Sequence, residues 1–484
     1  MSNLIGDMAR AVGAVGVRGL PTLKRAAGVV TRRVPIPQPL LLAGPGSAVR
    51  LARAVAGFGH RRVMLVTDAV IHRLGLLGPL LEALAATATK VVVFDEVMPD
   101  APLPVVQAGL ARFRAERCEA VLAVGGGSVI DAAKVIALGA TNDKPLAEMA
   151  GYFRARHAPA PIYAVPTTAG TGSEVTVAAV IADPDAQRKL VIADTRLVPD
   201  MAALDPLLMA GLPPAVTAAT GMDALTHAVE AYIGGWATPA SDRMARAAVS
   251  MIHAHLPRAV ADGGDLEARE QMALASTYAG LAFTRASVGN VHALAHQVGA
   301  HRHVPHGLAN AVLLPPVLRF SRPAADARLA QLARHLGLKG RGDAALAAAC
   351  IDAVQALNDR IGIPRTMPDL EAADIPALAA AACHEADFNY PVPRRMSVDD
   401  AQALLRGVLA ASDDAGQPSG EGTVSGKAKA PRPRRAAGPK AAEPDRRSPP
   451  PTPPARARRT TTTTTTTTTA ASTAQARPRR KASA

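Results

Sequence analysis

The chain has 484 residues, of which 49% are hydrophobic but only 3% aromatic, so it can bury two or three largely aliphatic domain cores. Its net charge of +14 is concentrated in residues 411–484, which hold 15 Lys and Arg against 5 Asp and Glu, whereas the first 410 residues hold 39 against 35. The folded part is therefore nearly neutral, which argues against nucleic-acid binding by that part, and three widely spaced cysteines argue against a disulfide scaffold.

Residues 1–36 are predicted to be a leader that is poorly ordered or forms a short helix. The leader is rich in arginine but lacks the continuous apolar region of a secretion signal. No uninterrupted apolar stretch of about 18 residues, the length of a membrane-spanning helix, is found. The cysteine usage also fits a reducing compartment. We therefore expect a cytoplasmic protein with no membrane partner.

Residues 37–205 are predicted to form an α/β domain. Helical patterns cover residues 77–88 and 103–116. Short apolar runs of the kind that form buried strands occur at residues 61–68, 90–97, 120–127 and 161–168. Apolar strands joined by helices are typical of a parallel sheet that is covered on both faces.

The pattern changes twice after this region. Long amphipathic stretches rich in Ala and Leu predict an all-α domain over residues 206–412. From residue 413 onward Pro, Ala, Gly, Ser, Lys and Arg dominate, and residues 460–469 are all Thr. A segment with so little apolar surface cannot offset the entropy cost of ordering, so residues 413–484 are predicted to be a disordered basic tail.

Two glycine-rich turns in the α/β region predict a nucleotide site. The sequence AVLAVGGGSVIDAAK (120–134) is a strand, a turn with Gly126, Gly127 and Ser128, and a helix whose N-terminus can hold a pyrophosphate. A second turn, PTTAGTGSEVT (166–176), also follows a strand, and parallel strands bring such turns to one edge of the sheet. Asp68 ends the first clear strand, where a carboxylate can bind ribose hydroxyls and disfavour NADP, or simply cap a helix.

Acidic and histidine side chains in the helical region repeat a four-residue spacing. Asp223 and His227 lie at positions i and i+4 and therefore share one helix face, and His292 and His296 repeat this spacing. His306 follows in the sequence VPHG. One carboxylate with several imidazoles suits a borderline divalent metal such as Fe²⁺ or Zn²⁺.

With these motifs the chain resembles the iron-containing (group III) alcohol dehydrogenase family over roughly residues 37–410. The resemblance rests on VTD, GGGSVIDAAK, PTTAGTGSEVT, the lysine of QRKL, GMDALTHAVEAY, VHALAHQVGA and VPHGLANAVLLP, in the order in which the family has them. It implies an N-terminal NAD-binding α/β domain and a C-terminal helical metal-binding domain, with the active site between them. It also implies a homo-oligomer.

The resemblance assigns roles to individual residues. The four metal ligands would be Asp223, His227, His292 and His306, with Fe²⁺ favoured over Zn²⁺. His296 matches a histidine beside the nicotinamide that does not bind metal. The cofactor-binding residues would be Asp68, Gly126, Gly127, Ser128, Thr167, Thr168, Thr171, Lys189 and His296.

The chain departs from the family pattern at a few positions. Asp100 stands where many members have an asparagine, which puts a cofactor contact there in doubt. Ala178 and Ala179 follow the EVT element where some members have a polar residue, so we expect a less polar pocket than in diol-specific relatives. His301 and His303 match no family ligand and are predicted to be solvated loop residues.

The predicted function is reversible hydride transfer between NAD and a primary or small alcohol, with its aldehyde or ketone as product. One alternative is a maleylacetate reductase-like, NAD(P)H-dependent keto reductase, which would require cationic residues in the pocket, and Arg285 near the metal histidines keeps that alternative open. An alternative of another class is a nucleic-acid-binding protein that acts through the basic tail. No aromatic residues are interleaved there for base stacking, so a solvated extension is the preferred interpretation.

Overall fold

The computed structural model describes residues 34–87, 89–186, 188–367 and 369–410. The predicted leader, apart from residues 34–36, and the whole predicted tail lie outside these residues. The structure therefore does not test either prediction.

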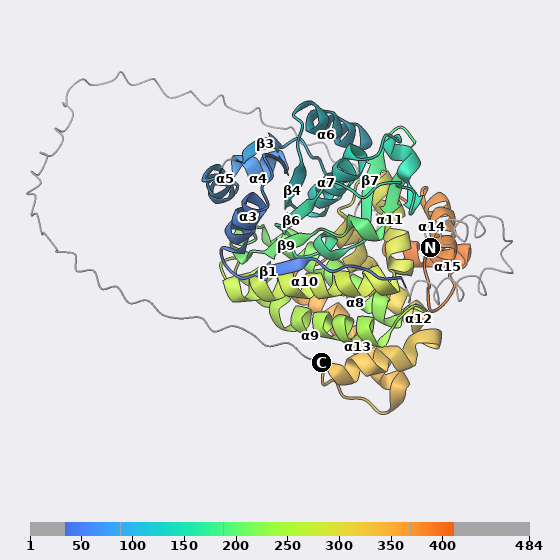
Figure 1. The fold of residues 1–484 in the computed structure, drawn as a ribbon. Helices are drawn as coiled ribbons and strands as arrows, with labels where there is room; N and C mark the ends of the chain where they lie inside the picture. Colours follow the sequence, from blue (N-terminus) through green and yellow to red (C-terminus); the bar gives the residue numbers. More distant parts are fainter. Residues whose placement is uncertain (1–33, 88, 187, 368, 411–484) are drawn as a thin grey trace, which may run out of the picture. The chain divides into compact units, whose positions relative to one another are not determined.

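Within the described residues, six parallel strands form the main sheet, in the order β1-β9-β6-β4-β2-β3 (Figure 1). Their bounds are β1 Leu40–Ala43, β2 Arg62–Val66, β3 Lys90–Phe94, β4 Ala120–Gly125, β6 Ile162–Pro166 and β9 Met201–Leu204. Four of them fall within the predicted runs, and the predicted parallel α/β arrangement is confirmed.

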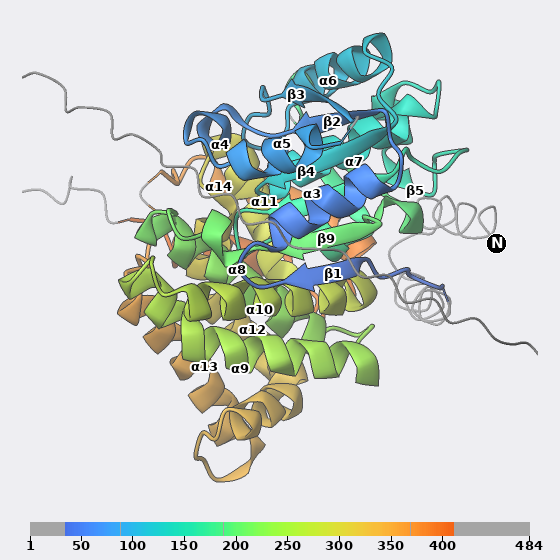
Figure 2. The ribbon, with the colours of Figure 1, turned by 60° about the vertical axis from the view of Figure 1, so that its left-hand side comes forward.

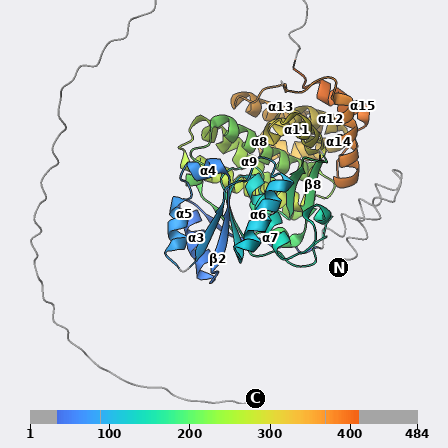
Figure 3. The ribbon, with the colours of Figure 1, turned by 90° about the horizontal axis from the view of Figure 1, so that it is seen from above.

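Helices cover both faces of this sheet, as Figure 3 shows. One face packs against α3 and α5, and the other against α6 and α7. Strand residues alternate between the two cores: Val63 and Leu65 point to the first, and Met64 and Val66 to the second. The helices are α3 Ser47–Gly57, α4 Ala69–Arg73, α5 Gly78–Ala85, α6 Leu103–Ala115 and α7 Gly127–Ala140.

The sequence analysis missed several short strands. The end of the predicted α/β domain, just before its boundary at residue 205, contains β9, which pairs with both β1 and β6. A second sheet, in the order β5-β8-β7, was also not predicted. Its strands are β5 Gly151–Tyr152, β7 Ala178–Asp183 and β8 Arg188–Ala193, and β7 pairs antiparallel to β8. Strands such as MAAL carry no β-branched residues, so their local sequence does not favour strand over helix.

The second half of the described chain is helical and has its own aliphatic core. Its helices are α8 Pro214–Ile233, α9 Pro239–Ala261, α10 Leu266–Ala286, α11 Asn290–Arg302, α12 His306–His335, α13 Gly342–Arg360, α14 Ile375–Asn389 and α15 Val398–Arg406. Figure 2 shows α9 and α10 beside the β1 edge of the sheet. The domain boundary near residue 205 stays a prediction.

Among the described helices, none has both the length and the apolar character that crossing a membrane would require.

Candidate metal centre and cofactor loops

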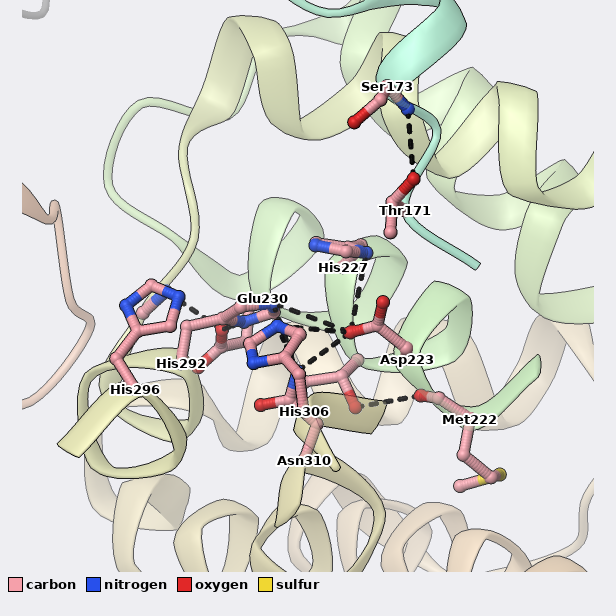
Figure 4. A network of polar contacts seen from close by, with 12 residues as sticks. Thr171, Ser173, Met222, Asp223, His227, Glu230, His292, His296, His306 and Asn310 are labelled. Atoms are coloured by element: carbon pink, nitrogen blue, oxygen red, sulfur yellow. Dashed lines mark hydrogen bonds and ion pairs between the residues drawn. The ribbon is translucent and has the colours of Figure 1, made fainter. Parts of the chain in front are cut away.

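Helix α8 presents Asp223 and His227 on one buried face, as their spacing predicts. Two other helices bring histidines to the same carboxylate: His292 comes from the first turn of α11, and His306 begins α12. The Asp223 Oδ1 atom lies 3.9 Å from His227 Nδ1, 3.8 Å from His292 Nε2 and 3.5 Å from His306 Nε2. The fold thus gathers all four predicted ligands, as Figure 4 shows.

A glycine allows α12 to start this close to α8. A Cβ atom on Gly307 would lie 2.4 Å from the carbonyl oxygen of Ala219 and 2.8 Å from its carbonyl carbon. Both contacts are with helix backbone, which cannot move aside as a flexible side chain can. Glycine at this position therefore lets the preceding residue, His306, reach Asp223.

The four side chains meet the chemical requirements of a divalent cation. Burial lowers the pKa of His227 and of His306 to about 3, and it lowers the pKa of His292 well below its usual range. The imidazoles are therefore neutral near pH 7, with lone pairs available to a metal. His227 Nδ1 is buried and has no hydrogen-bond partner among the described residues. A bound cation would satisfy this nitrogen, so the residues fit Fe²⁺ or Zn²⁺.

Glu230, which was not predicted from the sequence as a site residue, accepts a hydrogen bond from His292 Nδ1, whereas Nε2 of the same ring faces Asp223. Its carboxylate accepts hydrogen bonds from His292 Nδ1 at 2.6 Å, from the Gly289 amide at 2.8 Å and from the Val291 amide at 2.7 Å. Burial raises the pKa of Glu230 to about 7, against the opposing effect of these backbone hydrogen bonds. Because Nδ1 is hydrogen-bonded to Glu230, Nε2 is the His292 nitrogen that faces Asp223 and the other predicted ligands.

Asn310 is a second residue that the sequence analysis missed. It lies one helical turn after His306, and its Nδ2 atom donates to Asp223 Oδ1 at 2.7 Å. The same nitrogen lies 3.2 Å from His292 Nε2 and 3.1 Å from His306 Nε2. The i+4 spacing from His306 was the available sequence signal, but an asparagine in a helix rarely marks a site by itself.

The two predicted cofactor loops lie against each other. A Cβ atom on Gly127 would meet Thr171 Cγ2 at 2.5 Å, and one on Gly126 would meet Thr168 Oγ1 at 3.5 Å. Helix α7 begins at Gly127 without a side-chain cap, which leaves its N-terminus available for an anion. Thr167, also predicted to bind cofactor, is buried at the end of β6, where its amide donates to the Gly125 carbonyl.

The second cofactor loop also packs on the helical half. Gly172 has a φ of +62°, and a Cβ there would lie 2.8 Å from the Cα of Gly280 and 3.0 Å from the Ser276 carbonyl oxygen. Glycine at both positions allows this loop to touch α10. The contact places Thr171 near the metal-ligand helices, as Figure 4 also shows.

The remaining predicted cofactor residues have partners within the protein. Asp68 caps α4, because its Oδ1 atom accepts from the amides of Val70 and Ile71, both at 2.9 Å. Lys189 Nζ lies 2.6 Å from Asp100 Oδ1. The Asp100 amide in turn donates to Ser128 Oγ at 3.0 Å.

Three of these residues therefore form a chain of contacts beside the first cofactor loop, from Lys189 through Asp100 to Ser128. Asp100 adopts a φ of +62°, a conformation that Asn and Asp tolerate better than most residues.

His296 lies beside two of the predicted metal ligands, His292 and His306, in ring contact with both. Its ring stacks on His306 with centroids 5.2 Å apart and meets the His292 ring edge-on at 5.8 Å. Its Nδ1 atom is 2.6 Å from Glu385 Oε1 on α14. Glu385 is 89 residues away in the chain, and nothing in the local sequence linked it to His296.

The structure places the residues of three further sequence-based expectations. Ala179 is fully buried in the α/β core, so only the partly exposed Ala178 fits the predicted pocket-lining role. His301 and His303 are exposed as predicted, but His301 lies in the last turn of α11 and His303 is that helix's C-cap. Arg285 donates to the Val34 carbonyl at 2.8 Å, a contact with the N-terminal segment that does not support a substrate-binding role.

Comparison with known protein families agrees with this geometry. Residues 39–206 match the model "Iron-containing alcohol dehydrogenase", and residues 217–409 match "Fe-containing alcohol dehydrogenase family, C-terminal". The probable alcohol dehydrogenase EutG of Escherichia coli is 42% identical over 69% of this chain and 84% of its own length. The 1,3-propanediol dehydrogenase of Klebsiella pneumoniae is 41% identical over 75% of this chain and 95% of its own.

Solved structures give the same result. The crystal structure of a 1,3-propanediol oxidoreductase superposes with a TM-score of 0.75 at 38% identity, over 78% of this chain and all of that one. A sulfoacetaldehyde reductase from Bifidobacterium kashiwanohense in complex with NAD⁺ gives 0.70 at 30% identity, over 78% of this chain and 99% of that one. The resemblance found in the sequence is thereby confirmed. The chain belongs to the iron-containing alcohol dehydrogenase family and is a metal-dependent, NAD-linked alcohol oxidoreductase.

Proposed function

We propose that Asp223, His227, His292 and His306 bind one divalent cation, Fe²⁺ in preference to Zn²⁺, at which a primary or small alcohol and its aldehyde or ketone are interconverted. The observation that carries this proposal is the convergence of the three imidazoles on Asp223, with His227 Nδ1 buried and lacking a partner among the described residues. When bound, the metal supplies a Lewis acid that lowers the pKa of the alcohol, and NAD supplies the hydride acceptor.

The α/β half holds the cofactor in this proposal. The backbone of Gly126 and Gly127 and the uncapped N-terminus of α7 bind the pyrophosphate, with hydroxyl groups from Ser128 and from the second cofactor loop beside them. The residues of that loop with this role are Thr167, Thr168 and Thr171.

Two charged residues complete the proposed cofactor site. Asp68 uses Oδ1 as the cap of α4, which leaves Oδ2 for the ribose hydroxyls and disfavours the extra phosphate of NADP. Lys189 contributes a positive charge on the cofactor side, and Asp100 holds its ammonium group in place.

His296 moves the proton in this proposal. Its Nδ1 atom is hydrogen-bonded to Glu385, so Nε2 is the nitrogen that can accept a proton. The proton leaves the alcohol, reaches Nε2 through the ribose hydroxyl, and passes from His296 toward solvent. The His296 side chain is 19% exposed, which gives the proton a route out.

The setting of the enzyme is also a proposal. Cysteine usage supports a cytoplasmic location, and the family resemblance supports a homo-oligomer. The substrate class, a small alcohol or carbonyl compound, rests on relatives that are named as alcohol and propanediol dehydrogenases.

Alanine substitution at each of the four ligands tests the site. Each variant should lose bound metal and alcohol oxidation together, whereas the NAD dissociation constant should change little because the pyrophosphate is held by the other half of the protein. His301→Ala is the matched control, since it removes an exposed imidazole from the last turn of α11, the helix that also carries His292. Full metal content together with full activity in any ligand variant would contradict the assignment of that residue.

A further inference from the structure

A carboxylate from another helix holds His296. Glu385 on α14 accepts from His296 Nδ1 through Oε1 at 2.6 Å and from Gln297 Nε2 through Oε2 at 2.6 Å. The Tyr390 hydroxyl donates to the same Oε1 atom at 2.5 Å. Both carboxylate oxygens are therefore engaged, and Glu385 and His296 are each only 19% exposed at the side chain.

We propose that Glu385 is a positioning residue for the alcohol dehydrogenase reaction: it holds the His296 ring with the proton on Nδ1, so that Nε2 is the proton acceptor. A neutral imidazole has one donor and one acceptor nitrogen, and a carboxylate can only accept when it is ionised. A hydrogen bond from Nδ1 to Glu385 therefore commits Nε2 to the acceptor role. The inference rests on the proposed role of His296 in proton transfer.

The surroundings keep Glu385 ionised and fixed. The pKa of Glu385 lies below its usual value, because the charge of a protonated His296 and the hydrogen bonds from His296, Tyr390 and Gln297 together outweigh the effect of burial. The three hydrogen bonds remain when His296 is neutral, and they favour the ionised carboxylate in that state too. Burial also raises the pKa of Tyr390 well above its usual value, and Glu385 adds to this shift, so the phenol stays a hydrogen-bond donor. These contacts give the carboxylate one preferred orientation.

The two carboxylates give His292 and His296 the same tautomer but leave their Nε2 atoms in different surroundings. His292 and His296 share one face of α11, and each bonds to a carboxylate through Nδ1, to Glu230 and Glu385 respectively. His292 Nε2 lies 3.8 Å from Asp223 Oδ1 within the metal cluster. Among the described residues, no hydrogen bond or ion pair joins His296 Nε2 to Asp223. With its proton on Nδ1, His296 therefore keeps Nε2 available to accept a proton.

A double-mutant cycle with His296→Ala and Glu385→Leu tests the inference. Glu385→Leu should lower kcat about 10- to 100-fold, the range seen when a metal-bound histidine loses its hydrogen-bond partner, with KM and bound metal nearly unchanged. Glu385→Gln should recover part of kcat, because its amide oxygen can still accept from Nδ1. In the His296→Ala background, Glu385→Leu should have almost no further effect.

Asp387→Asn is the matched control for α14. Asp387 lies two residues after Glu385 and pairs with Arg395 at 2.6 Å, away from His296, so its loss should leave kcat unchanged. Equal losses from Glu385→Leu in both backgrounds, or a kcat drop matched by loss of metal or of folded protein, would overturn the positioning role. A wild-type rate in His296→Ala alone would instead contradict the proposed proton step as well, so the two failures are distinguishable.

Discussion

The contact between α8 and α12 offers a test of the site that changes none of the proposed metal ligands. In Gly307→Ala the new methyl group would lie 2.4 Å from the Ala219 carbonyl oxygen. Because the Cβ atom is fixed to the backbone of α12 and meets the backbone of α8, the clash can be relieved only by moving the start of α12 away from α8. That movement carries His306 away from Asp223; in the unaltered protein His306 Nε2 lies 3.5 Å from Asp223 Oδ1.

Two magnitudes follow from this geometry. Overpacking a tight contact typically costs about 1–3 kcal/mol, and a Cβ atom that meets helix backbone should fall at the upper end, so we expect a loss of about 3 kcal/mol in the free energy of unfolding. A displaced ligand should weaken metal binding by about 10- to 100-fold, comparable with the loss of an outer-shell partner. Metal competition against a fluorescent chelator, with thermal unfolding of the same samples, measures both.

Gly57→Ala is the matched control. Gly57 is the last residue of α3, has no heavy atom within 4 Å of the added methyl, and should tolerate alanine without loss of stability. If Gly307→Ala binds metal as tightly as the unaltered protein, the close approach of α12 to α8 is not what places His306, and the reasoning is refuted.

Three further predictions concern other parts of the chain. The unaltered enzyme should prefer NAD clearly over NADP, and Asp68→Gly should reduce this preference, measured as the ratio of kcat/KM for the two cofactors. Equal kcat/KM values for NAD and NADP in the unaltered enzyme would contradict the proposed role of Asp68 at the ribose. Deletion of residues 413–484 should leave Tm and turnover nearly unchanged, since their composition lacks the apolar residues of a packed element, and a large loss of either would show that they contribute to the enzyme. Burial lowers the pKa of His253 to about 4, so the stability that its neutral form contributes is present above pH 6.5, the pKa in the unfolded chain, and is lost as the pH falls toward 4. Between pH 7 and 5, His253→Leu should therefore lose less free energy of unfolding than the unaltered protein, by on the order of 2 kcal/mol in urea unfolding. Equal losses in the two proteins would contradict this.

The main features of the fold could be predicted because they depend on local patterns. Buried strands such as β2 and β4 are continuous apolar runs, and the turn after β4 carries the glycines that begin α7. Strand β9 has the sequence MAAL, and only its pairing with β1 and β6 makes it a strand. Tertiary hydrogen bonding decided that element, and no local pattern could indicate it.

The proposed metal ligands could be named from their spacing and their match to the family, and the structure brings them together, whereas the residues that contact them could not be named from the sequence. Asp223 and His227 are four apart on one helix, a signal that can be read directly from the sequence. Glu230, Asn310 and Glu385 contact residues that lie 62, 87 and 89 positions away, respectively. A buried glutamate or asparagine in a helix becomes recognisable as a supporting residue only when the partner helix is in place.

In the proposed mechanism, one cation held by Asp223, His227, His292 and His306 is required for alcohol oxidation. The most direct measurement removes the metal from the purified protein, verifies its absence by elemental analysis, and follows NAD reduction as Fe²⁺ or Zn²⁺ is added back. We expect no oxidation in the metal-free protein and recovery that saturates near one ion per chain. Oxidation at the full rate after verified removal of the metal would contradict the account.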